Sequence, residues 1–337
     1  MASVVGLMQQ PAASALASRR AARLSRPGAV MGQAASPART HPYLGLAIGM
    51  AAVSSAAILI SFARREGVPA LTIAALRMCF SAAALAPVVL TRGRAELVRL
   101  PARDIGLAVA SGILLALHFA FWISSLDHTS VMSSVVLVSS NPLFVGLVSG
   151  FLLREPLRRS TIAGVAVAVV GGAVVGLSDL GQAGGASLRG DLLALLGAVA
   201  ASGYILIGRG LRQRVSLIPY VGLVYTTAAI ALLALALVSG SALQGFTPKG
   251  WLLVALLALG PQLIGHTSYN WALKHVSAIF VTVTILAEPI GATILAIAVL
   301  GQIPSWISLA GGGLILVGIW LVSRGERNTA KKVSRQL

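Results

Sequence analysis

The chain has 337 residues, of which 57% are hydrophobic and only 10% are charged, and its mean hydropathy is +0.89. Soluble domains carry about a quarter charged residues. This chain has too few charges to surround a core with a water-facing shell, so its solvent is expected to be lipid. The net charge of +17 does not indicate a nucleic-acid partner, because the basic residues lie in short loops and in the two tails.

Ten apolar stretches are each long enough to cross a bilayer as a helix, which takes about 20 residues. The predicted spans are 43–63, 70–90, 105–125, 130–153, 161–177, 191–208, 218–239, 250–272, 277–300 and 306–323. Most connections are short, so successive helices should run antiparallel. The sequence therefore predicts an all-α membrane protein with ten transmembrane helices.

The distribution of Lys and Arg gives this layout an orientation. If the N-terminus is cytoplasmic, 21 of the 26 basic residues fall in inside segments, four fall in outside loops, and Arg77 lies within a span. The positive-inside rule expects a bias of this kind. We therefore predict a multi-pass protein of the inner (plasma) membrane with both termini in the cytoplasm, and with a basic cytoplasmic tail at 324–337.

Residues 1–42 form a basic N-terminal segment before the first span. They contain several Arg, many Ala and Ser, and no acidic residue. That composition is typical of a targeting leader. A disordered cytoplasmic tail, or a true start at Met31, also accounts for it, and we prefer these two interpretations.

The two halves of the chain resemble each other when the sequence is shifted by 147–148 residues. Matched pairs occur in four helices at this near-constant offset, among them Gly49 and Gly197, Gly112 and Gly260, His118 and His266, Pro142 and Pro289, and Gly164 and Gly311. The two repeats, 43–178 and 190–323, would hold five helices each. Because five is odd, the second repeat enters the membrane from the opposite side. Inverted repeats of this kind are common in secondary carriers.

Short motifs at matching places in the two halves resemble those of a known family. The first half has Asn141-Pro142-Leu143-Phe144 followed by Arg154-Glu155, and the second has Glu288-Pro289-Ile290 followed by Leu300-Gly301. With the ten-helix layout over 43–323, the sequence resembles EamA-type carriers of the drug/metabolite transporter superfamily. The resemblance implies an exporter of amino acids, other metabolites or toxic compounds. Gln302 stands where the second half would repeat Glu155, so a contact of that carboxylate need not be mirrored.

Glu288 is the only acidic residue well inside a predicted span. A lone carboxylate at that depth is costly, so it should face the bundle interior or a water-filled cavity. Pro289 removes a helical donor and frees the carbonyl of Ile285, and Asn141-Pro142 repeats this device in the fourth span. Because carriers place substrate beside broken helices at mid-membrane, Glu288 and Asn141 are candidate binding or gating residues. A helix kink with a structural hydrogen bond is the alternative.

Arg77, His118 and His266 are basic side chains within predicted spans. Arg77 would either pair with a substrate carboxylate or with Glu288, or extend to the outer headgroups. His118 and His266 are equivalent residues of the two repeats, and an imidazole can both exchange protons near neutral pH and form an interhelix hydrogen bond. Neither has Cys, Asp or a second His at ligand spacing, so no metal site is expected.

A polar and aromatic stripe surrounds His266. Gln262, His266, Tyr269 and Asn270 follow the i, i+4, i+7, i+8 spacing of one helical face, and Trp122 shares the face of His118. We expect these side chains to line a cavity, with helix–helix packing as the alternative.

Small residues recur every four positions in the fifth span, at Gly164, Ala168, Gly172 and Gly176. Such an edge permits close packing of helices. The partner would be another helix of the same chain or a second copy in a homodimer.

Taken together, these patterns favour a secondary transporter that exports amino acids or related small metabolites by alternating access around a midplane site. Glu288 could carry a coupled proton, although exchange or uniport fits equally well. The sequence has no Walker A loop, GxSxG or HExxH pattern, so ATP-driven transport, enzymatic activity and a bound cofactor are not expected. The alternative is a membrane protein that does not transport: an intramembrane enzyme, a receptor or a scaffold.

Overall fold

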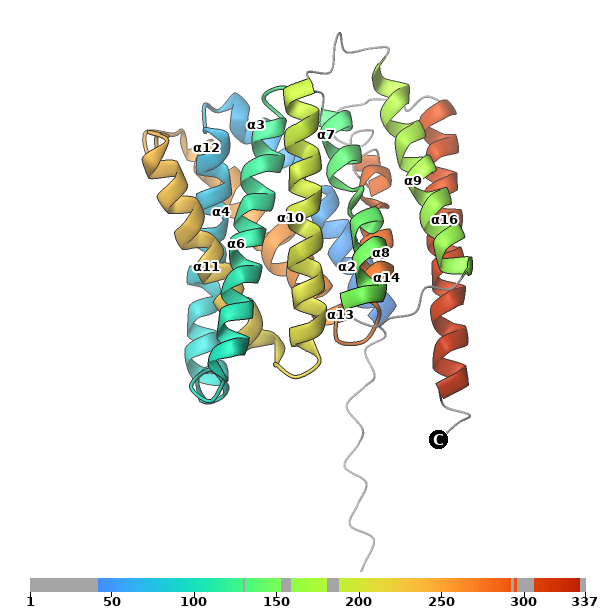
Figure 1. The fold of residues 1–337 in the computed structure, drawn as a ribbon. Coiled ribbons are helices and arrows are strands. Elements are labelled where there is room, and N and C mark those ends of the chain that lie inside the picture. Colours follow the sequence, from blue (N-terminus) through green and yellow to red (C-terminus); the bar gives the residue numbers. More distant parts are fainter. Residues whose placement is uncertain are drawn as a thin grey trace, which may run out of the picture. The chain divides into compact units, whose positions relative to one another are not determined.

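The computed structural model describes residues 42–129, 131–152, 159–180, 188–291, 294–295 and 306–333. All of them belong to one compact unit, and every regular element among them is a helix (Figure 1). The predicted N-terminal segment, apart from Pro42, lies outside the described residues, as do Arg154, Glu155, Leu300, Gly301 and Gln302.

The first half of the described chain consists of helices that overlap the first five predicted spans and continue the second one to Leu97. They are α2 (Pro42–Ser54), α3 (Ala56–Arg65), α4 (Ala70–Val88), the π-helix η1 (Val89–Gly93), α5 (Arg94–Leu97), α6 (Ala102–Ser125), α7 (Val131–Val138), α8 (Asn141–Leu152) and α9 (Arg159–Leu180). The pairs α2/α3 and α7/α8 are each one predicted span with an interruption.

The second half follows the same plan with one long π-helical segment. Its helices are α10 (Leu188–Arg212), α11 (Leu217–Val238), α12 (Pro248–Leu257), the π-helix η2 (Ala258–His266), α13 (Thr267–Ala272), α14 (Ala278–Ile285) and α16 (Trp306–Val333).

Six stretches of the described chain are long and apolar enough to cross a membrane. They are Pro42–Arg65, Ala70–Leu97, Ala102–Ser125, Leu188–Arg212, Leu217–Val238 and Pro248–Ala272. Shorter apolar helices occupy Arg159–Val174, Ala278–Gly291 and Leu309–Val322. Large apolar side chains such as Leu90, Leu147 and Ile230 face outward, as lipid-facing residues do. The chain is therefore an all-helical membrane protein, and a total of ten crossings stays a prediction.

Contacts between the helices repeat across the two halves. α2 packs against η2, and its second-half counterpart α10 packs against α6, the counterpart of η2. α4 packs against its own counterpart α11, and α9 lies beside its own counterpart α16 (Figure 1). Each contact in one half thus has an equivalent contact in the other half, which indicates a pseudo-two-fold relation between the repeats.

The crossing of α9 and α16 gives the direction of that relation. A Cβ added to Gly164 would lie 2.8 Å from the carbonyl oxygen of Gly318, and one added to Gly171 would lie 2.7 Å from that of Gly311. The earlier residue of one helix thus meets the later residue of the other, so the two helices are antiparallel. Gly164 corresponds to Gly311 and Gly171 to Gly318. The repeat therefore relates the contact between Gly164 and Gly318 to the contact between Gly311 and Gly171. Of the predicted small-residue edge, Gly164 and Ala168 approach α16 within the chain, whereas Gly172 faces Leu286. The surroundings of Gly176 lie outside the described side chains.

Candidate functional site

Two helices are interrupted at equivalent positions of the repeats. α7 ends at Val138 and helix resumes at Asn141, while α14 ends at Ile285 and helix resumes at Glu288. An offset of 147 residues relates Val138 to Ile285 and Asn141 to Glu288. The proline that follows each polar residue has no N–H, so the last carbonyls of α7 and α14 lose their helical donors. Both interruptions therefore present backbone and polar side-chain groups inside the bundle.

A cavity of about 40 Å³ lies beside the two interruptions. That volume corresponds to roughly three water molecules. Its polar lining comes from both repeats and consists of His118, Trp122, Ser139, Asn141, Tyr204, His266, Tyr269, Asn270 and Glu288. Seven residues predicted from the sequence are thus brought together around one space.

Many polar atoms of this lining are buried without a hydrogen-bond partner. Within the part of the chain that the structure describes, these atoms are Glu288 Oε1, Asn141 Oδ1, Asn270 Oδ1, Tyr269 Oη, Ser139 Oγ, Trp122 Nε1 and His266 Nδ1. Each such group costs about 1–3 kcal/mol when it is left unpaired. Because the set contains both donors and acceptors, it can bind a polar solute or ordered water in the cavity.

The two equivalent histidines have different surroundings. His118 Nδ1 lies 3.0 Å from the carbonyl oxygen of Gly197 on α10, and the His118 ring stacks on Trp122 with 5.9 Å between centroids. His266 Nδ1 has no partner among the described residues. The interhelix hydrogen bond considered for both residues is therefore present for His118, whereas the ring nitrogen of His266 is free to meet a ligand.

Asn270 is held in the lining by Tyr204, which was not among the residues predicted from the sequence. Its Nδ2 donates to Tyr204 Oη at 2.5 Å and to the His266 carbonyl oxygen at 2.9 Å. Tyr204 lies on α10 three residues after Ala201 and one before Ile205, which also line the cavity. The spacing of these three residues places them on one helical face, which could have predicted that they line the cavity together. The prediction would have been weak, because Tyr204 is the only polar residue among the three.

Arg77 and Gln262 lie outside the cavity lining. Arg77 is 0% exposed, its Nε donates to Gln262 Oε1 at 3.1 Å, and its Cζ lies 4.2 Å from the ring centroid of Phe119. Arg77 therefore does not extend to the headgroups, and it makes no ion pair with Glu288.

Gln262 is the one member of the predicted stripe that does not line the cavity. It lies in the π-helix η2, four residues before His266. His266, Tyr269 and Asn270 reach the cavity, while Gln262 turns to Arg77.

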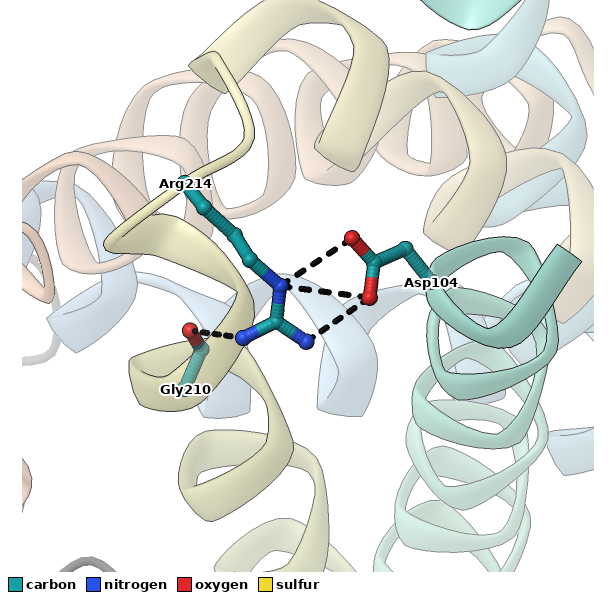
Figure 2. A network of polar contacts seen from close by, with 3 residues as sticks. All are labelled: Asp104, Gly210 and Arg214. Atoms are coloured by element: carbon teal, nitrogen blue, oxygen red, sulfur yellow. Dashed lines mark hydrogen bonds and ion pairs between the residues drawn. The ribbon is translucent and has the colours of Figure 1, made fainter. Parts of the chain in front are cut away.

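Ion pairs join segments of the chain away from the cavity. Glu66 accepts from Lys249 Nζ and Thr247 Oγ1, each at 2.7 Å, and these hydrogen bonds hold the pKa of Glu66 below its usual 4.5. Asp104 accepts from Arg214 Nη2 at 2.7 Å and from its Nε at 3.0 Å, and Arg214 Nη1 donates to the Gly210 carbonyl oxygen at 3.2 Å (Figure 2). Lys249 and Arg214 are largely exposed, so solvent screens both pairs, and we assign them the role of holding neighbouring segments together.

An all-helical bundle with two related halves and a cavity lined by both is an architecture that many membrane carriers share. The model of the EamA-like transporter family matches residues 42–177 and 188–324. The chain belongs to this family, which is part of the drug/metabolite transporter superfamily.

Relatives at low identity carry transporter names. The chain is 26% identical over 262 residues to an uncharacterized transporter of Clostridium kluyveri, covering 74% of this chain and 83% of that protein. It is 26% identical over 215 residues to a probable terminal-alkyne amino-acid exporter of Streptantibioticus cattleyicolor, covering 62% and 70%. A solved crystal structure has the same fold, with a TM-score of 0.68 at 24% identity over 85% of this chain and 99% of that one.

Proposed function

We propose that the protein is a secondary transporter that exports amino acids or related small metabolites across the plasma membrane. It works by alternating access around the cavity between the repeats, with ten membrane crossings and both termini in the cytoplasm. The solute binds among the unpaired groups of the lining, with Glu288 and Asn141 as its principal contacts.

The observation that carries the proposal is the set of unpaired polar atoms beside the two helix interruptions. A bundle that only had to be stable would pair these groups or replace them with apolar side chains. Their presence in both repeats supports a site that is shared between two opposed halves. When such halves exchange conformations, the site opens first to one side of the membrane and then to the other.

The chemistry of the lining supports a small solute with both polar and charged groups. The Glu288 carboxyl group offers acceptors to an ammonium group, whereas Trp122 Nε1 and Tyr269 Oη offer donors. The amino-acid exporter of Streptantibioticus cattleyicolor is a relative with a substrate of this class in its name. Because the cavity is small in this conformation, we expect the solute to enter a more open one.

A metabolite screen in proteoliposomes tests the proposal. Purified protein is reconstituted, and counterflow is measured for a mixture of amino acids and related metabolites. We expect at least one amino acid to be carried by the wild type and not by a folded Glu288→Gln variant. Leu147→Ala, on a side chain that is 80% exposed on α8, is the control that should retain flux. Folded wild-type protein that carries no member of the mixture would overturn the proposal.

A further inference from the structure

We infer that Arg77 and Gln262 form a carboxylate-binding site beside the central cavity. This inference rests on the proposed transport function, and it gives the solute one required chemical group. The site is made by α4 and the π-helix η2, which pack against each other.

In this cluster of two side chains, Arg77 presents the unused donors. A guanidinium group can only donate, so the atom of Gln262 that faces Arg77 Nε must be Oε1. This leaves Gln262 Nε2 pointing away from Arg77, and the Gln262 side chain also interacts with the hydroxyl group of Tyr225. Nη1 and Nη2 of Arg77 are buried and have no partner among the described residues. Arg77 therefore has two adjacent donor nitrogens available to one acceptor group.

The charge of the cluster selects an anion. No carboxylate of the described chain lies within ion-pair distance of Arg77. The ring of Phe119 stabilises the cation by cation–π attraction, but a ring face does not replace acceptors for the free N–H groups. A carboxylate matches the planar guanidinium with two parallel hydrogen bonds. It would also neutralise a buried charge, which is costly to leave unpaired.

One aromatic ring links this cluster to the cavity. Phe119 contacts Arg77 and also lies 4.9 Å from the His118 ring and 5.2 Å from the His266 ring, measured between centroids. Both histidines line the cavity. A rotation of Phe119 would therefore connect the Arg77 donors with the cavity. A solute whose amino group meets Glu288 could then direct its carboxylate toward Arg77, which makes α-amino acids the fitting class.

Thermal unfolding of the detergent-solubilised protein tests the site without any transport assay. The probes are sodium acetate, sodium chloride at equal ionic strength, and acetamide. We expect acetate alone to raise the unfolding midpoint of the wild type. Gln262→Glu places a carboxylate of the protein beside Arg77, so this variant should have a higher midpoint and no acetate response. Gln213→Glu makes the same change at an exposed position and should keep the response.

Two results would overturn the site: equal midpoints of the wild type in acetate and chloride, or an acetate response that persists in Gln262→Glu.

A measurement of flux separates this inference from the proposed function. In proteoliposomes, the wild type should carry an L-amino acid at least about tenfold faster than the corresponding carboxamide, because a site built for an acceptor rejects its analogue. Equal rates would overturn the carboxylate site and leave the transport function intact. If folded protein carries neither compound while acetate still raises the midpoint, the transport function fails instead.

Discussion

Asn141 and Glu288 are equivalent residues of the two repeats, and each is the first residue after a two-residue interruption in a helix. An oxygen atom of each is buried without a hydrogen-bond partner, and both side chains line one cavity. The repeats thus place a neutral amide on one side of the site and a carboxyl group on the other. This asymmetry gives the cavity lining one carboxyl group, that of Glu288, and the first two predictions follow from it.

Replacement of Glu288 by Gln should stop or uncouple transport while the protein still folds. The amide keeps the shape of the side chain but cannot lose a proton or pair with an ammonium group. Flux should fall by about tenfold or more, the equivalent of ~1.4 kcal/mol. If Glu288 carries a coupled proton, the wild-type flux in proteoliposomes changes with external pH and any residual flux of the variant does not. A wild-type flux that is independent of pH would eliminate the proton role.

Asn141→Leu should separate stability from function. The substitution removes an unpaired buried oxygen, so the unfolding midpoint in detergent should stay equal or rise. Flux should nevertheless fall, because the solute loses a contact. Ser140→Ala is the neighbouring control, since Ser140 Oγ donates to the carbonyl of Leu137, at the end of α7. A lower midpoint with undiminished flux would instead make Asn141 a structural residue.

Gly318→Ala should destabilise the contact between α9 and α16. The added Cβ would lie 2.5 Å from Ala168 Cβ and 2.6 Å from the Gly164 carbonyl oxygen, so the helices would have to separate. Overpacking of this kind costs about 1–3 kcal/mol, which should lower the unfolding midpoint.

Gly313→Ala on the same helix is the matched control for this change. An added Cβ there meets nothing within 4 Å. Since alanine favours helix by up to about 1 kcal/mol over glycine, this variant should be as stable as the wild type or more so. Equal midpoints for the Gly318 and Gly313 variants would argue against the close crossing.

The sequence predicted the helical class and the repeat because apolar length and a constant offset are visible without any tertiary contact. It also brought seven of the cavity residues to notice, since polar side chains are conspicuous inside apolar spans. The position at which α10 ends was not predicted from the sequence. α10 ends at Arg212 rather than at 208. Arg212, which lies beyond the predicted span 191–208, is 2% exposed and donates from Nε to the Asn270 carbonyl oxygen at 3.1 Å.

Other features of the site could not be predicted from a 3.6-residue period. The π-helical turns of η2 are visible only in the hydrogen-bond geometry of the folded bundle. The contacts of Arg77 with Gln262 and Phe119 join three helices far apart in sequence. Interactions of this type depend on tertiary packing, which the local pattern of one span does not contain.

The most direct measurement of the central claim is thiol accessibility at Ser139 during transport. Ser139 is 1% exposed, lines the cavity and has an unpartnered Oγ. Cys79 is the single cysteine, so Ser139→Cys is made in a Cys79→Ala background with Leu147→Cys on the outer face of α8 as control. We predict that a membrane-impermeant thiol reagent inhibits flux through Ser139→Cys from either side, that the transported solute protects it, and that Leu147→Cys retains flux. Modification of Ser139→Cys without loss of flux, or no reaction from either side, would contradict a solute pathway through this cavity.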